Sequence, residues 1–77
     1  MNFEQVRDVI VETLNCDTAS VTPTARLRED LGADSLDIVD LSMALEEVFG
    51  VDELTEDEIS GITTVGDLVR FLQSRLD

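Results

Sequence analysis

One long apolar-periodic run, residues 35–49, most constrains what this chain can fold into. Asp34 precedes the run as a typical helix N-cap, and Asp37, three residues later, suits the returning half of a capping box. Gly50 follows the run, as glycine commonly does where a helix ends. The pattern therefore predicts a helix over 35–49 with Ser35 as its first residue, so that the Ser35 hydroxyl is displayed at the positive end of the helix dipole.

Three further helices are predicted, each opened by a polar cap. Asn2 caps the first, Thr55 begins a Thr-x-x-Glu capping box that opens a short helix ending near Gly61, and Thr64 caps the last. Helical spacing of the apolar residues predicts which positions face the core. These are Phe3, Val6, Ile10 and Leu14 with Val9 at the margin, then Ile59 and Ile62, and finally Val65, Leu68, Val69, Leu72 and Leu76 with Phe71 at the edge.

A long connection, residues 15–34, separates the first two long helices. It is rich in Asn, Asp, Ser, Thr and Pro, which suit turns and suppress regular structure. Val21, Leu27 and Leu31 interrupt the polar stretch, and we expect them to insert into the core and hold the connection down. The sequence thus predicts one all-α domain over residues 1–77. Its fold is a small four-helix bundle of three longer helices and one short helix, with a long loop after the first.

The 35–49 helix carries two apolar strips. The strip expected to face the core consists of Ile38, Leu41, Leu45, Val48 and Phe49. The second strip consists of Leu36, Val39 and Met43, interleaved with the carboxylates of Asp40, Glu46 and Glu47. This second strip either packs on another part of the bundle or forms an exposed ridge. An exposed ridge edged with carboxylates would dock onto a basic, apolar groove of a partner.

Charge and composition exclude several classes of function. Eighteen acidic residues face five arginines, with no lysine and no histidine, and the net charge of −13 disfavours nucleic acid and anionic membranes as partners. Without a histidine or lysine, the usual bases that activate Ser35 or Cys16 as a nucleophile are absent, so no catalytic residue is expected. The acidic stretches fit no calcium-binding loop, and no metal site is expected.

The sequence also bears on location. It has no apolar run of the roughly 20 residues that a membrane span requires. Its N-terminus lacks the basic and apolar regions of a signal peptide. A lone cysteine cannot form an internal disulfide, as expected in a reducing compartment. We therefore expect a monomeric cytoplasmic protein that meets basic partners.

Three stretches resemble the acyl carrier proteins, and together they cover nearly the whole chain in the right order. They read EDLGADSLD at residues 29–37, MALEEVF at 43–49 and ITTV at 62–65. One departure lies between the last two stretches, where the segment is one residue longer than in the common bacterial pattern. The usual isoleucine-proline is replaced there by Glu53-Leu54-Thr55, and we expect Leu54 to take the place of the isoleucine in the core.

The resemblance implies a function for Ser35. A phosphopantetheinyl transferase would move 4′-phosphopantetheine from coenzyme A onto the Ser35 hydroxyl, and the thiol of that arm would carry acyl chains as thioesters, which fold back between the helices. Fatty acid synthesis enzymes with basic patches would dock on the residues around it. The residues we expect to dock, the second apolar strip with its carboxylates and the cap residue, are Asp34, Leu36, Val39, Asp40, Met43, Glu46 and Glu47.

Two alternatives to a carrier of dissociated bacterial fatty acid synthesis stay open at this point. The first is a carrier for a specialised polyketide or lipopeptide pathway; the sequence Asp34-Ser35-Leu36 modestly favours fatty acid synthesis over peptidyl carriers. The second, from another class, is an unmodified acidic helical module whose second apolar strip binds a partner helix.

Overall fold

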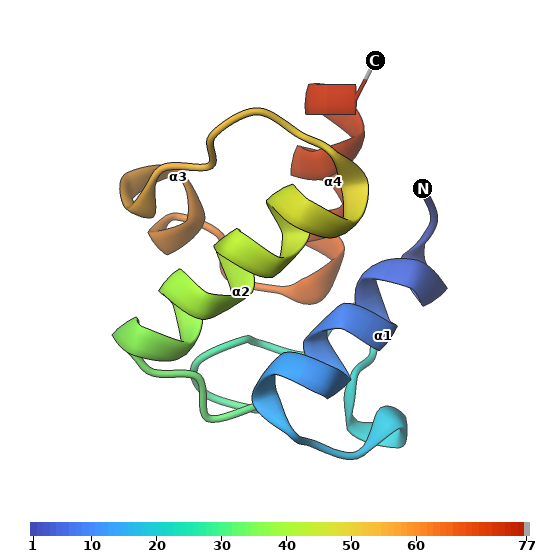
Figure 1. Cartoon of the computed structure of the whole chain (residues 1–77). Coiled ribbons are helices and arrows are strands. Elements are labelled where there is room, and N and C mark those ends of the chain that lie inside the picture. The colour runs from blue at the N-terminus through green and yellow to red at the C-terminus, as the bar shows by residue number, and fades with distance from the viewer. Residues whose placement is uncertain (77) are drawn as a thin grey trace.

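The computed structural model describes residues 1–76, with the backbone alone at residue 56, so residue 77 of the expected domain lies outside the described residues. Over residues 1–76, four α-helices follow one another, and α2 crosses the middle of the molecule between α1 and α3 (Figure 1). A single turn of 3-10 helix, η1, lies in the long connection before α2. The predicted all-α bundle is confirmed. The bounds of the elements are α1 (Phe3–Leu14), η1 (Thr18–Ser20), α2 (Ser35–Phe49), α3 (Glu56–Ser60) and α4 (Val65–Leu76).

Side-chain caps fix where the helices begin, as predicted. The Gln5 N–H donates to Asn2 Oδ1 at the start of α1 (2.9 Å), and the Asp67 N–H donates to Thr64 Oγ1 at the start of α4 (3.1 Å). Each bond satisfies an amide that has no acceptor within its own helix. Gly50 ends α2 in the left-handed conformation at φ 64°, where a side chain would be strained.

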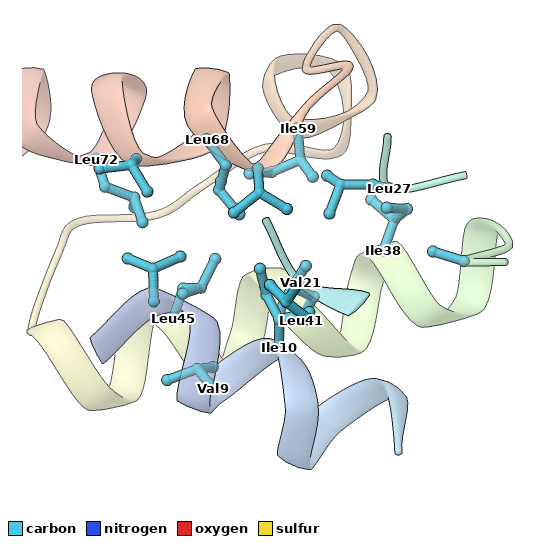
Figure 2. Packing of buried hydrophobic residues seen from close by; sticks show 14 of the residues in the cluster. Val9, Ile10, Val21, Leu27, Ile38, Leu41, Leu45, Ile59, Leu68 and Leu72 are labelled. Carbon is cyan, nitrogen blue, oxygen red and sulfur yellow. The ribbon is translucent and has the colours of Figure 1, made fainter. Parts of the chain in front are cut away.

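The core is filled by side chains from all four helices, with Ile59 coming from α3, together with residues from the connections (Figure 2). Ile10, Leu41 and Leu68 are fully buried, one from each long helix. Burial of such side chains is the main source of stability in a domain of this size. Val21, Leu27 and Leu54 also enter the core as predicted, the last at 4% exposure.

Two predicted core residues are exposed instead. Val48 keeps 59% of its surface, because the buried face of α2 is centred on Leu45 and takes in Ser42 at one border, leaving Val48 outside the other. Ser42 escaped prediction because it is polar, but its hydroxyl is satisfied by donating to the Val39 carbonyl (2.8 Å). Leu76 is 40% exposed because it is the last residue of α4. Half-buried rather than fully buried are Phe3, Leu14, Leu31, Phe49 and Ile62, which pack at the margin of the core.

Backbone pairing ties the long connection to the start of α4. Arg26 and Thr64 form an isolated antiparallel bridge, and the Leu27 N–H donates to the Thr63 carbonyl (3.0 Å). These bonds pull the connection onto the bundle, where the Leu27 side chain is fully buried. The connection is therefore a positioned part of the fold.

Gly66 lies against this connection more closely than any side chain would allow. The Gly66 N–H donates to the Pro23 carbonyl oxygen at 2.9 Å. A Cβ built at residue 66 would meet the same oxygen at 2.9 Å, a separation that real Cβ atoms essentially never show. The connection and α4 are thus joined through a contact that only a glycine accommodates.

Candidate modification site and docking face

The N-terminus of α2 is held by a reciprocal pair of aspartates. Asp34 Oδ1 accepts from the Asp37 N–H (2.9 Å), and Asp37 Oδ2 accepts from the Asp34 N–H (3.1 Å). The Asp34 carbonyl also accepts from the Ile38 N–H (3.0 Å), which is the first bond of the helix. This is the capping box that the sequence predicts, with aspartate at both positions. The cap fixes the direction in which the helix leaves the preceding loop.

Ser35, the first residue of α2, is exposed. Two residues before it, Ala33 is buried at 5% exposure, and its N–H donates to the Leu27 carbonyl (3.0 Å). Gly32 makes the turn at φ 72°, and the position its Cβ would occupy has no neighbouring atom within 4 Å. The chain is therefore anchored just before Ser35 and then emerges to the surface. Ser35 is therefore an exposed residue that directly follows an anchored stretch of backbone.

Arg26 organises the loop that leads to this serine. Its backbone N–H donates to Asp30 Oδ2 (2.8 Å), and its guanidinium pairs with Asp30 (3.3 Å) and Glu29 (2.6 Å). The hydrogen bonds from the Arg26 backbone and then from its side chain hold the pKa of Asp30 below its ordinary value. The hydrogen bond and charge of Asp30 in turn raise the pKa of Arg26. Both groups are thereby kept charged, and the loop is closed by their attraction.

The residues named for docking lie along α2 and at its cap. Leu36 is 75% exposed and Met43 is 59% exposed, although apolar side chains of this size are usually buried. Asp34, Asp40 and Glu47 are also exposed, while Val39 and Glu46 are half-buried. We call this set, Asp34, Leu36, Val39, Asp40, Met43, Glu46 and Glu47, the docking face. The structure brings its members onto one helix with apolar and acidic side chains interleaved.

Glu46 differs from the other carboxylates of the docking face. Its Oε2 accepts a hydrogen bond from the Leu54 N–H at 2.6 Å, across eight residues of chain. Sequence patterning did not reveal this bond, because Glu46 sits on the helical wheel beside Met43 and Glu47 like a solvent-facing acid. No local signature links it to the connection after α2.

A shallow groove between α1 and α2 is a second feature that sequence reasoning missed. It borders the docking face at Glu47 and contains Val48, which was predicted to be buried. A usable signal was present, since Val48 lies at the edge of the apolar strip and follows two glutamates. The groove is lined by Val9, Glu12 and Thr13 of α1 and by Ala44, Glu47 and Val48 of α2.

The chemistry available around Ser35 is that of an acceptor for a transferred group. The chain contains no histidine and no lysine, and the groups beside the hydroxyl are the Asp34 and Asp37 carboxylates, which are already engaged in the cap. Over the described residues, no helix has both the length and the apolar character needed to cross a membrane. The geometry defines a class of protein, a small all-helical domain that exposes a serine at the tip of a helix.

Comparison with known proteins identifies the group and the family. A family model described as "Phosphopantetheine attachment site" matches residues 4–72. The curated proteins named "Acyl carrier protein" from Helicobacter pylori strains G27 and HPAG1 are each 52% identical to this chain over 71 residues, which is 92% of this chain and 90% of theirs. The chain belongs to the acyl carrier protein family. It is a carrier of acyl groups and not an enzyme, and its cofactor is phosphopantetheine.

Proposed function

We propose that Ser35 is the residue that carries 4′-phosphopantetheine and that the chain serves dissociated fatty acid synthesis in the cytoplasm. The observation that carries this proposal is the exposed hydroxyl at the first position of α2, within the matched region and directly after an anchored turn. Space around Gly32 and the exposure of Leu36 leave a long flexible group unobstructed on either side of the serine. The whole domain, residues 1–77, is proposed to act as one carrier.

The division of labour between this chain and its transferase follows from the residues present. Ser35 Oγ bonds to the phosphorus of the phosphopantetheine moiety, the pyrophosphate P–O bond of coenzyme A breaks, and adenosine 3′,5′-bisphosphate leaves. The transferase supplies the base that removes the serine proton, because this chain has neither histidine nor lysine. Once attached, the arm supplies a thiol that holds acyl groups as thioesters activated for transfer. The Asp34–Asp37 cap holds the attachment point rigid, so that the arm swings from a fixed origin.

The docking face is proposed to bind the transferase and the enzymes of chain elongation. Leu36 and Met43 offer apolar contact area, and the flexible thioether of Met43 adapts to different surfaces. Asp40 and Glu47 add charge for steering toward basic patches on those enzymes. One helix therefore presents both the attachment point and the surface by which partners find it.

Mass spectrometry tests the assignment of Ser35. The purified protein is incubated with coenzyme A and a phosphopantetheinyl transferase, and it is expected to gain one phosphopantetheine. Ser35→Ala is expected to gain none, because the acceptor oxygen is gone. Ser60→Ala, which removes an exposed serine at the end of α3, is the matched control and is expected to be modified like the original chain.

Two outcomes contradict the proposal. Failure of the original chain to gain mass, under conditions that modify another acyl carrier protein, supports the unmodified interaction module. Modification that persists in Ser35→Ala moves the attachment site elsewhere. The pathway is tested separately, by offering the modified chain to a reconstituted set of fatty acid synthesis enzymes and measuring whether acyl chains are loaded and extended.

A further inference from the structure

Glu46 is the hydrogen-bond acceptor for both ends of the segment that joins α2 to α3. Its carbonyl accepts from the Gly50 N–H (2.9 Å), and its carboxylate accepts from the Leu54 N–H (2.6 Å). One residue of α2 therefore closes residues 50–54 into a loop. We call these residues the α2–α3 segment, and Figure 1 shows the path of this connection between the two helices.

The α2–α3 segment contributes two side chains to the core, and the Glu46 carboxylate positions one of them. Val51 and Leu54 are buried, at 9% and 4% exposure. Between the two anchored amides, Val51, Asp52 and Glu53 donate no backbone hydrogen bond to any side chain or carbonyl that the structure describes. The placement of Leu54 in the core thus depends on its packing and on the single charge-assisted hydrogen bond that its N–H donates to the Glu46 carboxylate of α2.

The same carboxylate lies at the edge of the docking face. Glu46 is half-buried, follows exposed Met43 by three residues and precedes exposed Glu47. Residues three apart are neighbours on a helix surface, so a basic side chain of a partner that docks over exposed Met43 comes close to Glu46. A carboxylate that shares its charge with such a cation becomes a weaker acceptor for an amide, in the way that a neutral acceptor is weaker than a charged one.

We propose that Glu46 is a latch that couples partner docking on α2 to release of the α2–α3 segment. In the free protein, the Glu46 carboxylate holds the Leu54 amide and keeps the Leu54 side chain in the core. When a cationic partner residue pairs with Glu46, the bond weakens and the segment loosens between α2 and α3. This inference rests on the proposed docking face, and it makes Glu46 a positioning residue for the segment as well as a contact for partners.

Amide hydrogen exchange at Leu54 in the free protein tests the first half of this proposal. Glu46→Gln keeps an acceptor but removes the charge, and it is expected to speed exchange by about fivefold, the difference between a charged and a neutral hydrogen bond. Glu46→Ala removes the acceptor and is expected to speed exchange by more than about tenfold. Glu47→Gln is the matched control and is expected to leave exchange at Leu54 unchanged, since Glu47 does not bond to the segment.

The same measurement in the presence of a saturating phosphopantetheinyl transferase, without coenzyme A, tests the coupling. Binding is expected to speed exchange at Leu54 in the original chain by about fivefold, to the rate of Glu46→Gln. In Glu46→Gln itself, binding is expected to have no further effect at Leu54, because the charge has already gone. Protection of exposed amides in α2 reports that the complex has formed.

Each outcome is decisive. Equal exchange at Leu54 in the original chain and in Glu46→Ala overturns the latch, and it does so without reference to Ser35. Protection of α2 with unchanged exchange at Leu54 overturns the coupling while the proposed carrier function stands. If the transferase does not bind, both the coupling and the proposed docking of the transferase are overturned. The mass measurement on Ser35 is an independent check on that docking.

Discussion

At the scale of single residues, the ion pair of Arg26 with Asp30 shows how local charge prepares the site. The chain has five arginines and eighteen acidic residues, and Arg26 forms ion pairs within the loop that leads to Ser35. Because the Arg26 backbone and side chain both bond to Asp30, the interaction combines a turn with a charge pair. Such an arrangement holds the loop more firmly than an exposed ion pair alone.

The lowered pKa of Asp30 gives a pH dependence with a definite sign. Its folded-state pKa lies below the ordinary value of 3.8, so the stabilisation is fully present above that value and is lost as the pH falls through the lowered pKa. We therefore expect the difference in free energy of unfolding between the original chain and Asp30→Ala to be constant from neutral pH downward and to shrink below about pH 3.8. Urea unfolding at a series of pH values measures this difference, and a difference that stays constant throughout the acid range contradicts it.

At the scale of elements, α2 has one face that packs in the core and one that is proposed to bind partners. Leu41 is fully buried on the core face, whereas Leu36 is 75% exposed on the docking face. The two residues have the same side chain and lie on the same helix, so they form a matched pair. Comparing them therefore separates stabilisation of the fold from the proposed binding of partners.

Truncating each leucine is expected to give opposite results. Leu41→Ala leaves a cavity in the core and is expected to cost about 2–5 kcal/mol of unfolding free energy. Leu36→Ala is expected to change that free energy by less than about 0.5 kcal/mol and to slow modification by the transferase. Thermal unfolding and the rate of mass gain measure the two effects. Unchanged modification of Leu36→Ala would remove Leu36 from the proposed docking face.

The elements were well predicted where their signals are local. Each helix start is indicated by a capping pattern that spans only four residues, and the structure confirms all four starts. The capping residues are Asn2, Asp34, Thr55 and Thr64. Side chains at the border of a helix face were predicted less well. Val48 was predicted to be buried and is exposed, whereas Ser42 was not predicted to be buried and is. A helical wheel does not reveal which neighbouring helix lies on which side.

Pairings between distant segments could not be predicted at all. The Arg26–Thr64 bridge and the bond from the Leu54 amide to Glu46 join positions whose residue types carry no mark of their partners. For the candidate site, the exposure of Ser35 followed from its position at the helix tip. The two hydrogen bonds that Glu46 accepts, from the Gly50 and Leu54 amides, could be found only in the structure.

At the scale of the whole molecule, the dominant quantity is the net charge of −13. The molecule measures 28 Å along its longest axis, which is close to the screening length of about 30 Å in 0.01 M salt. Nearly all its carboxylates therefore repel one another at low ionic strength. At 0.15 M the screening length falls to about 8 Å, and most of that repulsion is removed.

Stability is accordingly expected to rise with salt. Relief of about 1 kcal/mol of repulsion would raise the melting temperature of a domain of this size by about 4–8 °C between 0.01 M and 0.15 M sodium chloride. Thermal unfolding followed by circular dichroism measures the shift, with an uncharged osmolyte at equal osmolality as the control. A melting temperature that is independent of salt would show that repulsion among the acidic residues does not lower the stability of the fold.

The contact between Gly66 and the Pro23 carbonyl reverses an ordinary rule of protein engineering. Within a helix, exchanging glycine for alanine usually stabilises by about 1 kcal/mol. Here the added methyl group would collide with the Pro23 oxygen, so the same exchange would push α4 away from the connection that leads to Ser35. A library randomised at position 66 and selected for folded protein would consequently return glycine. An engineered variant of higher stability therefore has to keep this helical glycine.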